Sequence, residues 1–154
     1  MHNSIFDFVA ELLPDHPDAV RFLHELFHMM HVWDDLIDKD KPIDDAAVNS
    51  AFTSLLVHIP ANPFYQRFFS QLHPLISVAT LDWLAANDLE RTGQRLDEEI
   101  AFITRSSYAA LIVKTLELCR GYGFAQRVTA DVRRTIHQEG FDAYRAALAN
   151  QKGV

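Results

Sequence analysis

The side chains best suited to chemistry lie in one short stretch, residues 24–38, which reads HELFHMMHVWDDLID. At about 100° per residue on a helix, one narrow face of this stretch is polar. That face carries His24, His28, His31, Asp35 and Asp38, with Asp34 at its edge. The opposite face is apolar and is expected to enter the core: Leu26, Met29, Met30, Trp33, Leu36 and Ile37. A solvated face would ordinarily carry Lys, Glu and Gln, so the pattern predicts an inward-facing polar pocket that holds a cation or a polarised ligand.

Two zinc-type or di-metal patterns fit the first half of this stretch. His24-Glu25-Leu26-Phe27-His28 satisfies HExxH, in which two His bind Zn²⁺ and the Glu activates water. Glu25 and His28 also form one ExxH pair of a di-metal helical bundle, but the chain has no second such pair. A third interpretation needs no metal, because the same face can form a polar network between packed helices.

The second half of the stretch favours a different cation. Asp34-Asp35-Leu36-Ile37-Asp38 is a DDxxD motif. Asp34 and Asp38 lie one helical turn apart and Asp35 leans toward both, so their oxygens can converge on a hard cation such as Mg²⁺. Carboxylates this close repel one another unless a cation neutralises them. The motif therefore predicts a magnesium site.

The segment from His31 to Asp38, preceded by the aromatic segment from Phe22 to Met30, resembles a known family. It is similar to the first aspartate-rich helix of class I trans-isoprenyl diphosphate synthases, especially their squalene and phytoene synthase branch. The resemblance implies an all-α, terpenoid-synthase-like bundle in which Asp34, Asp35 and Asp38 hold Mg²⁺ ions that grip a substrate diphosphate. It also implies an apolar cavity for a prenyl tail.

Other residues are candidates for the same site. His28 and His31 would add a metal ligand or a proton carrier. Arg105 and Tyr108 are three residues apart and can present a cation and a phenol to a phosphate, although such a patch can also be plain helix packing. Asn87-Asp88-Leu89-Glu90 opens like the second acidic motif of terpene cyclases, but Arg91 and Arg95 stand where its hydroxyl and glutamate belong.

The elements that position these residues are all expected to be helices. Proline, glycine and capping residues divide the chain, and no run of residues alternates as a strand would. We expect a bundle of about six helices, with a linker over residues 90–95, a kink or division at Pro74 and an interruption near Gly140. Their expected ranges are residues 3–13, 17–38, 45–59, 62–88, 97–120 and 124–150. The second and fifth helices should face each other across the polar pocket.

Composition limits the function classes. The 154 residues suggest a single domain over residues 1–154, and a hydrophobic fraction of 49% suffices for a packed core. A net charge of −7 argues against nucleic-acid binding, and no apolar run is long enough to insert in a membrane. A single cysteine, Cys119, excludes an intramolecular disulfide, and the start of the chain lacks a signal-peptide pattern, so we expect a cytoplasmic protein.

The sequence thus predicts Mg²⁺-dependent binding of a diphosphate-bearing small molecule, with prenyl diphosphates as the class that the resemblance implies. A chain of roughly half the family's length has too few helices to surround a prenyl tail, so a homodimer is expected to complete the cavity. Three alternatives remain open. They are an all-α nucleotide pyrophosphatase, an HExxH zinc hydrolase and a non-enzymatic interaction protein.

Overall fold

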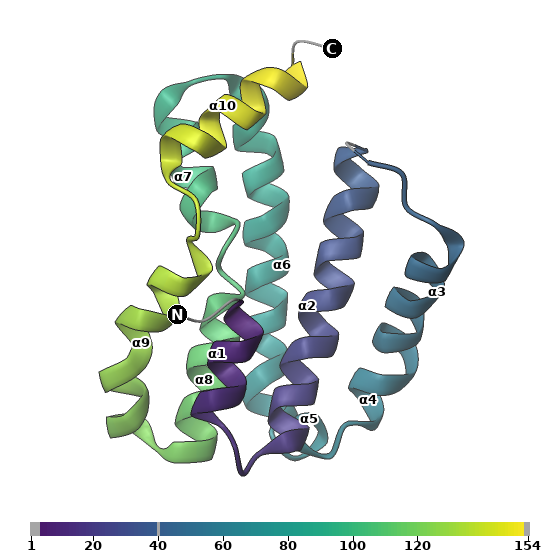
Figure 1. Cartoon of the computed structure of the whole chain (residues 1–154), viewed down its shortest axis with the longest axis vertical. Helices are drawn as coiled ribbons and strands as arrows, with labels where there is room; N and C mark the ends of the chain where they lie inside the picture. The colour runs from purple at the N-terminus through teal and green to yellow at the C-terminus, as the bar shows by residue number, and fades with distance from the viewer. Residues whose placement is uncertain (1–3, 40, 153–154) are drawn as a thin grey trace. The chain divides into compact units, whose positions relative to one another are not determined.

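The computed structural model describes residues 4–39 and 41–152. Every regular element in these residues is a helix and none is a strand, so the predicted all-α class is confirmed. The chain divides into two compact units, residues 1–69 and residues 70–154, which we describe separately (Figure 1). The expectations of one domain over residues 1–154 and of a terpenoid-synthase-like bundle stay predictions.

The first unit begins with two helices whose ends follow local signals. Helix α1 (Ile5–Leu12) starts at Ser4, whose Oγ accepts a hydrogen bond from the Asp7 backbone N–H at 3.2 Å. The other expected cap residue, Asn3, lies outside the described residues. Helix α2 (Pro17–Asp38) has the predicted bounds, with Pro17 at its first turn, where a missing N–H costs nothing.

The next helical segment runs back along α2 and contains a π turn. It consists of α3 (Asp45–Thr53), the π-helix η1 (Ser54–His58) and α4 (Ile59–Ala61), with Asp44 as the N-cap of α3 (Figure 1). The helix expected over residues 45–59 continues to Ala61, past Pro60. A proline crowds the carbonyl four residues before it, and the wider π turn, in which the Ile59 N–H bonds the Ser54 carbonyl, lies at that point.

Aromatic packing closes the first unit around the start of α2. Helix α5 (Pro63–Arg67) is capped by Asn62, whose Oδ1 accepts from the Tyr65 N–H at 3.0 Å. The Asn62 amide also donates to the Asp18 carbonyl at 2.9 Å, which ties α5 to α2. Phe22 is fully buried and stacks on Tyr65 with ring centroids 5.0 Å apart. Aromatic stacking and apolar burial thus hold α2 and α5 together.

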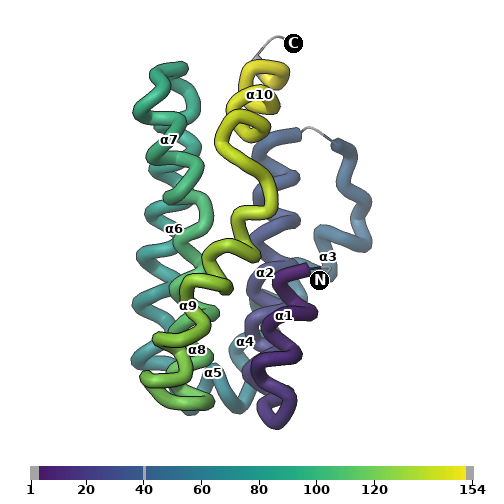
Figure 2. The backbone as a smooth tube through the Cα atoms, turned by 60° about the vertical axis from the view of Figure 1, so that its left-hand side comes forward, coloured from purple at the N-terminus to yellow at the C-terminus, as the bar shows by residue number. Residues whose placement is uncertain are grey.

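The second unit contains five helices among the described residues, seen from another side in Figure 2. Helix α6 (Phe69–Thr92) starts at the boundary between the units, and a two-residue turn, Gly93 and Gln94, leads to α7 (Arg95–Thr104). Gly93 has a φ of 72°, a conformation that favours glycine. The chain then forms α8 (Ala109–Arg120), α9 (Tyr122–Ile136) and α10 (Phe141–Lys152), in which α9 packs on α8 and α10 packs on α7.

Two expectations about α6 need correction. Residues 90–92, expected to belong to a linker, complete α6. The expected helix over residues 62–88 is divided at Phe68, between α5 and α6, and Pro74 does not divide it but lies inside α6 as its sixth residue. The first four N–H groups of a helix have no intrahelical partner anyway, so a proline this near the start removes one hydrogen bond close to a helix end.

The expected single helix over residues 97–120 is interrupted at residues 105–108. Hydrogen bonds between residues three apart replace the usual helical bonds between residues four apart. The Ser106 N–H donates to the Ile103 carbonyl and the Ser107 N–H donates to the Thr104 carbonyl, both at 3.1 Å. The Ser106 hydroxyl donates to the Ile103 carbonyl at 2.8 Å. Hydroxyl side chains that bond nearby carbonyls compete with the helical ladder, and this competition ends α7. The predicted interruption near Gly140 is confirmed, between α9 and α10.

We expect Phe22→Ala to lower the free energy of unfolding of the first unit by about 3–5 kcal/mol, because it removes a fully buried ring and leaves a cavity. Phe52, on α3, is 55% exposed and provides the control in the same unit. Phe52→Ala should change the free energy of unfolding by no more than about 0.5 kcal/mol. Urea denaturation of both variants measures the difference, and equal effects would contradict the packing described for Phe22.

Candidate functional site

The polar face of α2 contacts different neighbours along its length. His24 is exposed, and its ring packs edge-on against Phe6 of α1 with centroids 5.0 Å apart. His28 lies one turn further on, and its Nε2 is 3.1 Å from the Ser50 hydroxyl of α3. The two His of the HExxH pattern are therefore engaged by different helices.

Glu25 links α2 to the π turn. Its carboxylate accepts a hydrogen bond from the Ser54 hydroxyl, and its other oxygen lies 3.3 Å from His58 Nδ1. Burial alone would raise the pKa of this carboxyl, but the hydrogen bonds from Ser54 and His58 outweigh burial, and the pKa is lowered. Glu25 is thus held ionised in contacts between helices, as in the polar-network interpretation.

His31 is exposed and bonds its own helix. Its Nδ1 is 2.8 Å from the Phe27 carbonyl oxygen. A carbonyl only accepts hydrogen bonds, so neutral His31 carries its proton on Nδ1 and a lone pair on Nε2. This tautomer leaves Nε2 as the atom that can accept a proton or bind a cation.

The three aspartates of the DDxxD motif lie at the C-terminal end of α2. Asp34 and Asp35 are half-buried, whereas Asp38 is exposed. Lys41 Nζ is 3.0 Å from Asp35 Oδ1, and the last turn of α2 contains no basic residue. The carbonyl end of a helix is the negative end of its dipole, where carboxylates are unfavourable and cations are favourable. This end of α2 therefore concentrates negative charge.

The expectation that this whole face turns inward was wrong. His24, His31 and Asp38 are exposed, and so are Leu36 and Ile37, two residues expected in the core. The buried residues of α2 lie mainly in the N-terminal half of the helix: Ala19, Phe22, Leu23, Leu26, Phe27 and Val32. Within residues 4–39 and 41–152, no three His, Cys, Asp or Glu side chains gather as a metal-binding group.

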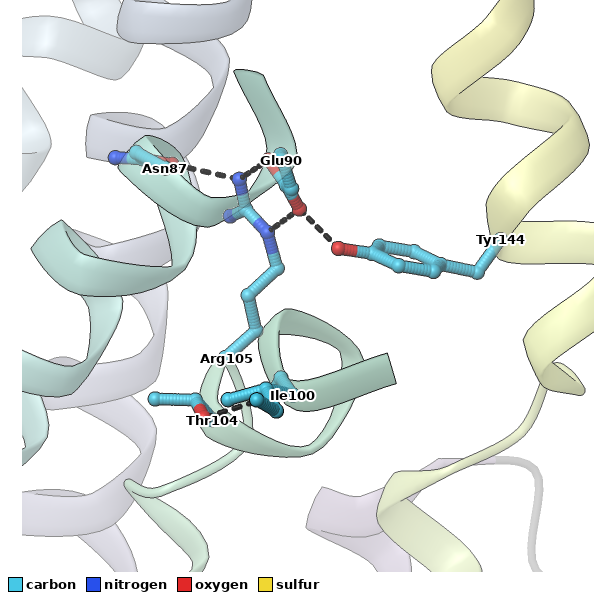
Figure 3. A network of polar contacts seen from close by, with 6 residues as sticks. All are labelled: Asn87, Glu90, Ile100, Thr104, Arg105 and Tyr144. Atoms are coloured by element: carbon cyan, nitrogen blue, oxygen red, sulfur yellow. Dashed lines mark hydrogen bonds and ion pairs between the residues drawn. The ribbon is translucent and has the colours of Figure 1, made fainter. Parts of the chain in front are cut away.

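The second unit contains a buried polar network that the sequence did not predict (Figure 3). Glu90 of α6 accepts two hydrogen bonds from Arg105, one from Nε and one from Nη2 at 2.5 Å. Arg105 Nη2 also donates to Asn87 Oδ1 at 2.6 Å, and the Tyr144 hydroxyl of α10 donates to Glu90. The side chains of Arg105 and Glu90 are only 19% and 10% exposed. The pair is a desolvated, bidentate ion pair.

The neighbours of this network extend it across the unit. Burial, together with the hydrogen bond and the negative charge of Glu90, raises the pKa of Tyr144 well above its ordinary value. Ser106 Oγ is 3.0 Å from His137 Nε2, and Glu98 accepts from Arg145 Nε at 2.7 Å. Tyr108, predicted beside Arg105, is half-buried at the start of α8.

Sequence reasoning identified Arg105 but missed its partners. Asn87 and Glu90 lie three residues apart, so they share one face of a helix. They belong to the segment that opens like the second acidic motif of terpene cyclases. No signal in the sequence indicated Tyr144, which lies 54 residues beyond Glu90.

Comparisons with protein-family models, curated proteins and solved structures found no significant match to this chain. Among the described residues, no helix is both long and apolar enough to cross a bilayer.

We expect Glu90→Gln to lower the free energy of unfolding by about 3–5 kcal/mol, because it leaves the buried Arg105 without a counter-charge. The matched control is Glu99→Gln, which breaks the Arg95–Glu99 pair on the surface of α7, where the side chains are 62% and 44% exposed. That change should cost about 1 kcal/mol or less. Denaturant titration of both variants tests the contrast, and similar losses would show that the Glu90 pair is not the buried anchor of this unit.

We expect Tyr144→Phe to make the second unit less sensitive to alkali. Because the pKa of Tyr144 is raised in the folded state, its contribution to stability is complete below the unfolded pKa of about 10 and is lost as pH rises above that value. Removing the hydroxyl should cost about 1–2 kcal/mol at neutral pH and flatten the decline above about pH 10. Tyr122→Phe, at a site 72% exposed, should leave the profile of thermal unfolding against pH unchanged.

Proposed function

We propose that the protein binds a divalent cation, with Mg²⁺ preferred, at the aspartate-rich end of α2, and that the cation binds a phosphate-bearing small molecule. Asp34, Asp35 and Asp38 are the proposed carboxylate ligands. The observation that carries the proposal is the clustering of three aspartates within the last five residues of α2, at the carbonyl end of the helix.

Electrostatics supports this choice of site. Carboxylates at the negative end of a helix dipole destabilise the helix, and neighbouring carboxylates repel one another. The Lys41 ammonium group forms an ion pair with Asp35. A local arrangement that costs stability is expected mainly where function requires it. A hard divalent ion, which prefers carboxylate, water and phosphate oxygens, relieves both repulsions.

The phosphate part of the proposal uses the same residues. When a cation neutralises Asp35, Lys41 can exchange that carboxylate for a phosphate oxygen of the ligand. His31 lies one turn before Asp35, and its Nε2 lone pair can accept a proton or a ligand hydrogen bond. His28 is hydrogen-bonded to Ser50 and would have to break that bond before it could accept a proton or bind the ligand. The resemblance to isoprenyl diphosphate synthases favours a prenyl diphosphate as the ligand.

The predicted phosphate contact of Arg105 and Tyr108 stays a prediction. The Arg105 guanidinium already donates to Glu90 and Asn87. Binding a phosphate there would require Arg105 to share or release its buried carboxylate, which is costly. We therefore centre the proposed site on α2 alone.

We expect Mg²⁺ to raise the unfolding temperature of the protein, by a stabilisation of about 2.7 kcal/mol when the free ion is at 100 times its dissociation constant. Pyrophosphate should add to the effect only when Mg²⁺ is present. Asp38→Asn should abolish the Mg²⁺ effect, because it removes a ligand.

Asp15→Asn is the matched control, because Asp15 is an exposed aspartate of the same unit outside the cluster. It should keep the full Mg²⁺ effect, measured by thermal unfolding and by calorimetric titration at constant ionic strength. Equal Mg²⁺ responses in the two variants would contradict the proposal. Incubation with prenyl diphosphates and with nucleoside triphosphates, each with and without Mg²⁺, then distinguishes a prenyl ligand from the nucleotide pyrophosphatase alternative by the product released.

A further inference from the structure

Helices α6 and α7 expose an unusual number of large apolar side chains. Six of them are between 44% and 66% exposed: Val78, Leu81 and Leu84 on α6, and Leu96, Ile100 and Ile103 on α7. Singly exposed apolar residues are ordinary, but a contiguous group marks an interaction surface. We call these six residues the α6–α7 face.

The six residues form one stripe on each helix. Their spacings, three residues apart on α6 and four then three apart on α7, place each set on one side of its helix. The opposite side of each helix carries buried residues. These are Trp83 and Glu90 in α6, and Glu98 and Ala101 in α7. Both stripes therefore lie on the side of the helix away from the core of the second unit.

The two helices form one hairpin. A turn of two residues, Gly93 and Gln94, joins them, and the Arg105 to Glu90 hydrogen bonds hold the end of α7 to α6. Figures 1 and 2 both draw α7 beside the C-terminal half of α6. The apolar stripes thus lie on the two helices of one hairpin.

We propose that the α6–α7 face is the interface of a symmetric homodimer. In a two-fold dimer the same patch occupies both sides of the interface, so a self-complementary surface is needed. Two α6–α7 hairpins that meet through these stripes form a four-helix layer with the apolar residues at its centre. The proposal is independent of cation binding at α2.

The distribution of charge favours a second copy as the occupant. Residues 70–154 contain ten acidic and ten basic residues, so two copies of this unit meet without net repulsion. Helices α6 and α7 themselves carry six acidic and two basic residues. Glu90 and Glu98 pair with Arg105 and Arg145 from other segments of the unit. Asp88 and Glu99 pair on the surface with Arg91 at 2.9 Å and with Arg95 at 2.8 Å. These pairs provide the polar rim that interfaces commonly have around an apolar centre.

The other exposed apolar group does not suit self-association. Phe52, Leu55, Leu56 and Val57, on α3 and η1, are also 44% to 69% exposed. They belong to residues 1–69, which contain eleven acidic but four basic residues and so account for the entire net charge of −7. Two copies that met through this patch would bring like charges together, which disfavours binding.

The area of the α6–α7 face agrees with a stable dimer. The exposed parts of the six side chains amount to roughly 600 Å² on each copy, or about 1,200 Å² for the pair, which is the lower limit for specific, stable interfaces. Flanking polar residues would add to this area. The face is therefore large enough for a dimer without any contribution from the first unit.

The test is the oligomeric state in solution, by sedimentation equilibrium and light scattering at about 100 μM chain, a concentration at which even a modest interface is populated. We expect a dimer that persists in about 1 M salt, where electrostatic contacts are screened. Leu81→Lys combined with Ile103→Lys should give a monomer with unchanged helical circular dichroism. Phe52→Lys combined with Leu56→Lys adds the same charge at equally exposed sites of the first unit, and should remain a dimer.

A monomeric wild-type protein, or a dimer that the Leu81 and Ile103 changes leave intact, would overturn the proposal. So would dissociation caused by the Phe52 and Leu56 changes alone. If the first variant fails to fold, hydrogen exchange of the wild-type protein decides the matter. Amides of residues 78–84 and 96–103 should exchange more slowly in concentrated than in dilute protein, whereas protection confined to other segments would refute the assignment.

Discussion

The second unit depends on one buried carboxylate. Glu90 accepts hydrogen bonds from Arg105 and from Tyr144, and Arg105 also binds Asn87. A buried charge is tolerated only when it is paired and its remaining lone pairs are satisfied. Because the acceptors Glu90 and Asn87 lie on α6, while the donors come from the turn after α7 and from α10, satisfying this charge ties the three segments together (Figure 3).

Local signals predicted the elements of the first unit well, and distant contacts explain what was missed. Pro17, Ser4 and Asp44 act on their own helix ends through the missing N–H and the capping oxygen, so their effect is readable from neighbouring residues. The break at residues 105–108 depends on hydroxyls that bond carbonyls in place of the helical N–H groups. Tyr144 and Glu90 meet only because the tertiary fold brings together residues 54 positions apart.

The candidate site on α2 was predictable as a face but not as a pocket. The helical period of about 100° fixes which side chains share a direction, yet the neighbouring helices decide which of them are covered. Phe6 covers one edge of His24, and the π turn binds Glu25, so the first half of the face serves contacts between helices. The aspartates follow at the end of α2, where backbone carbonyls and side-chain carboxylates add their negative charges.

The π turn over Ser54–His58 lets this segment hold one residue more than a regular helix without turning the later residues to other faces. A π turn holds one residue more than an α turn, so deleting one residue within it would give a regular α-helix in which the residues that follow keep their faces. Ile59 would then stay in the core. Deleting a residue from the regular turns of α3 would instead rotate everything that follows by about 100°, so the π turn is the place where this segment best tolerates the loss of one residue.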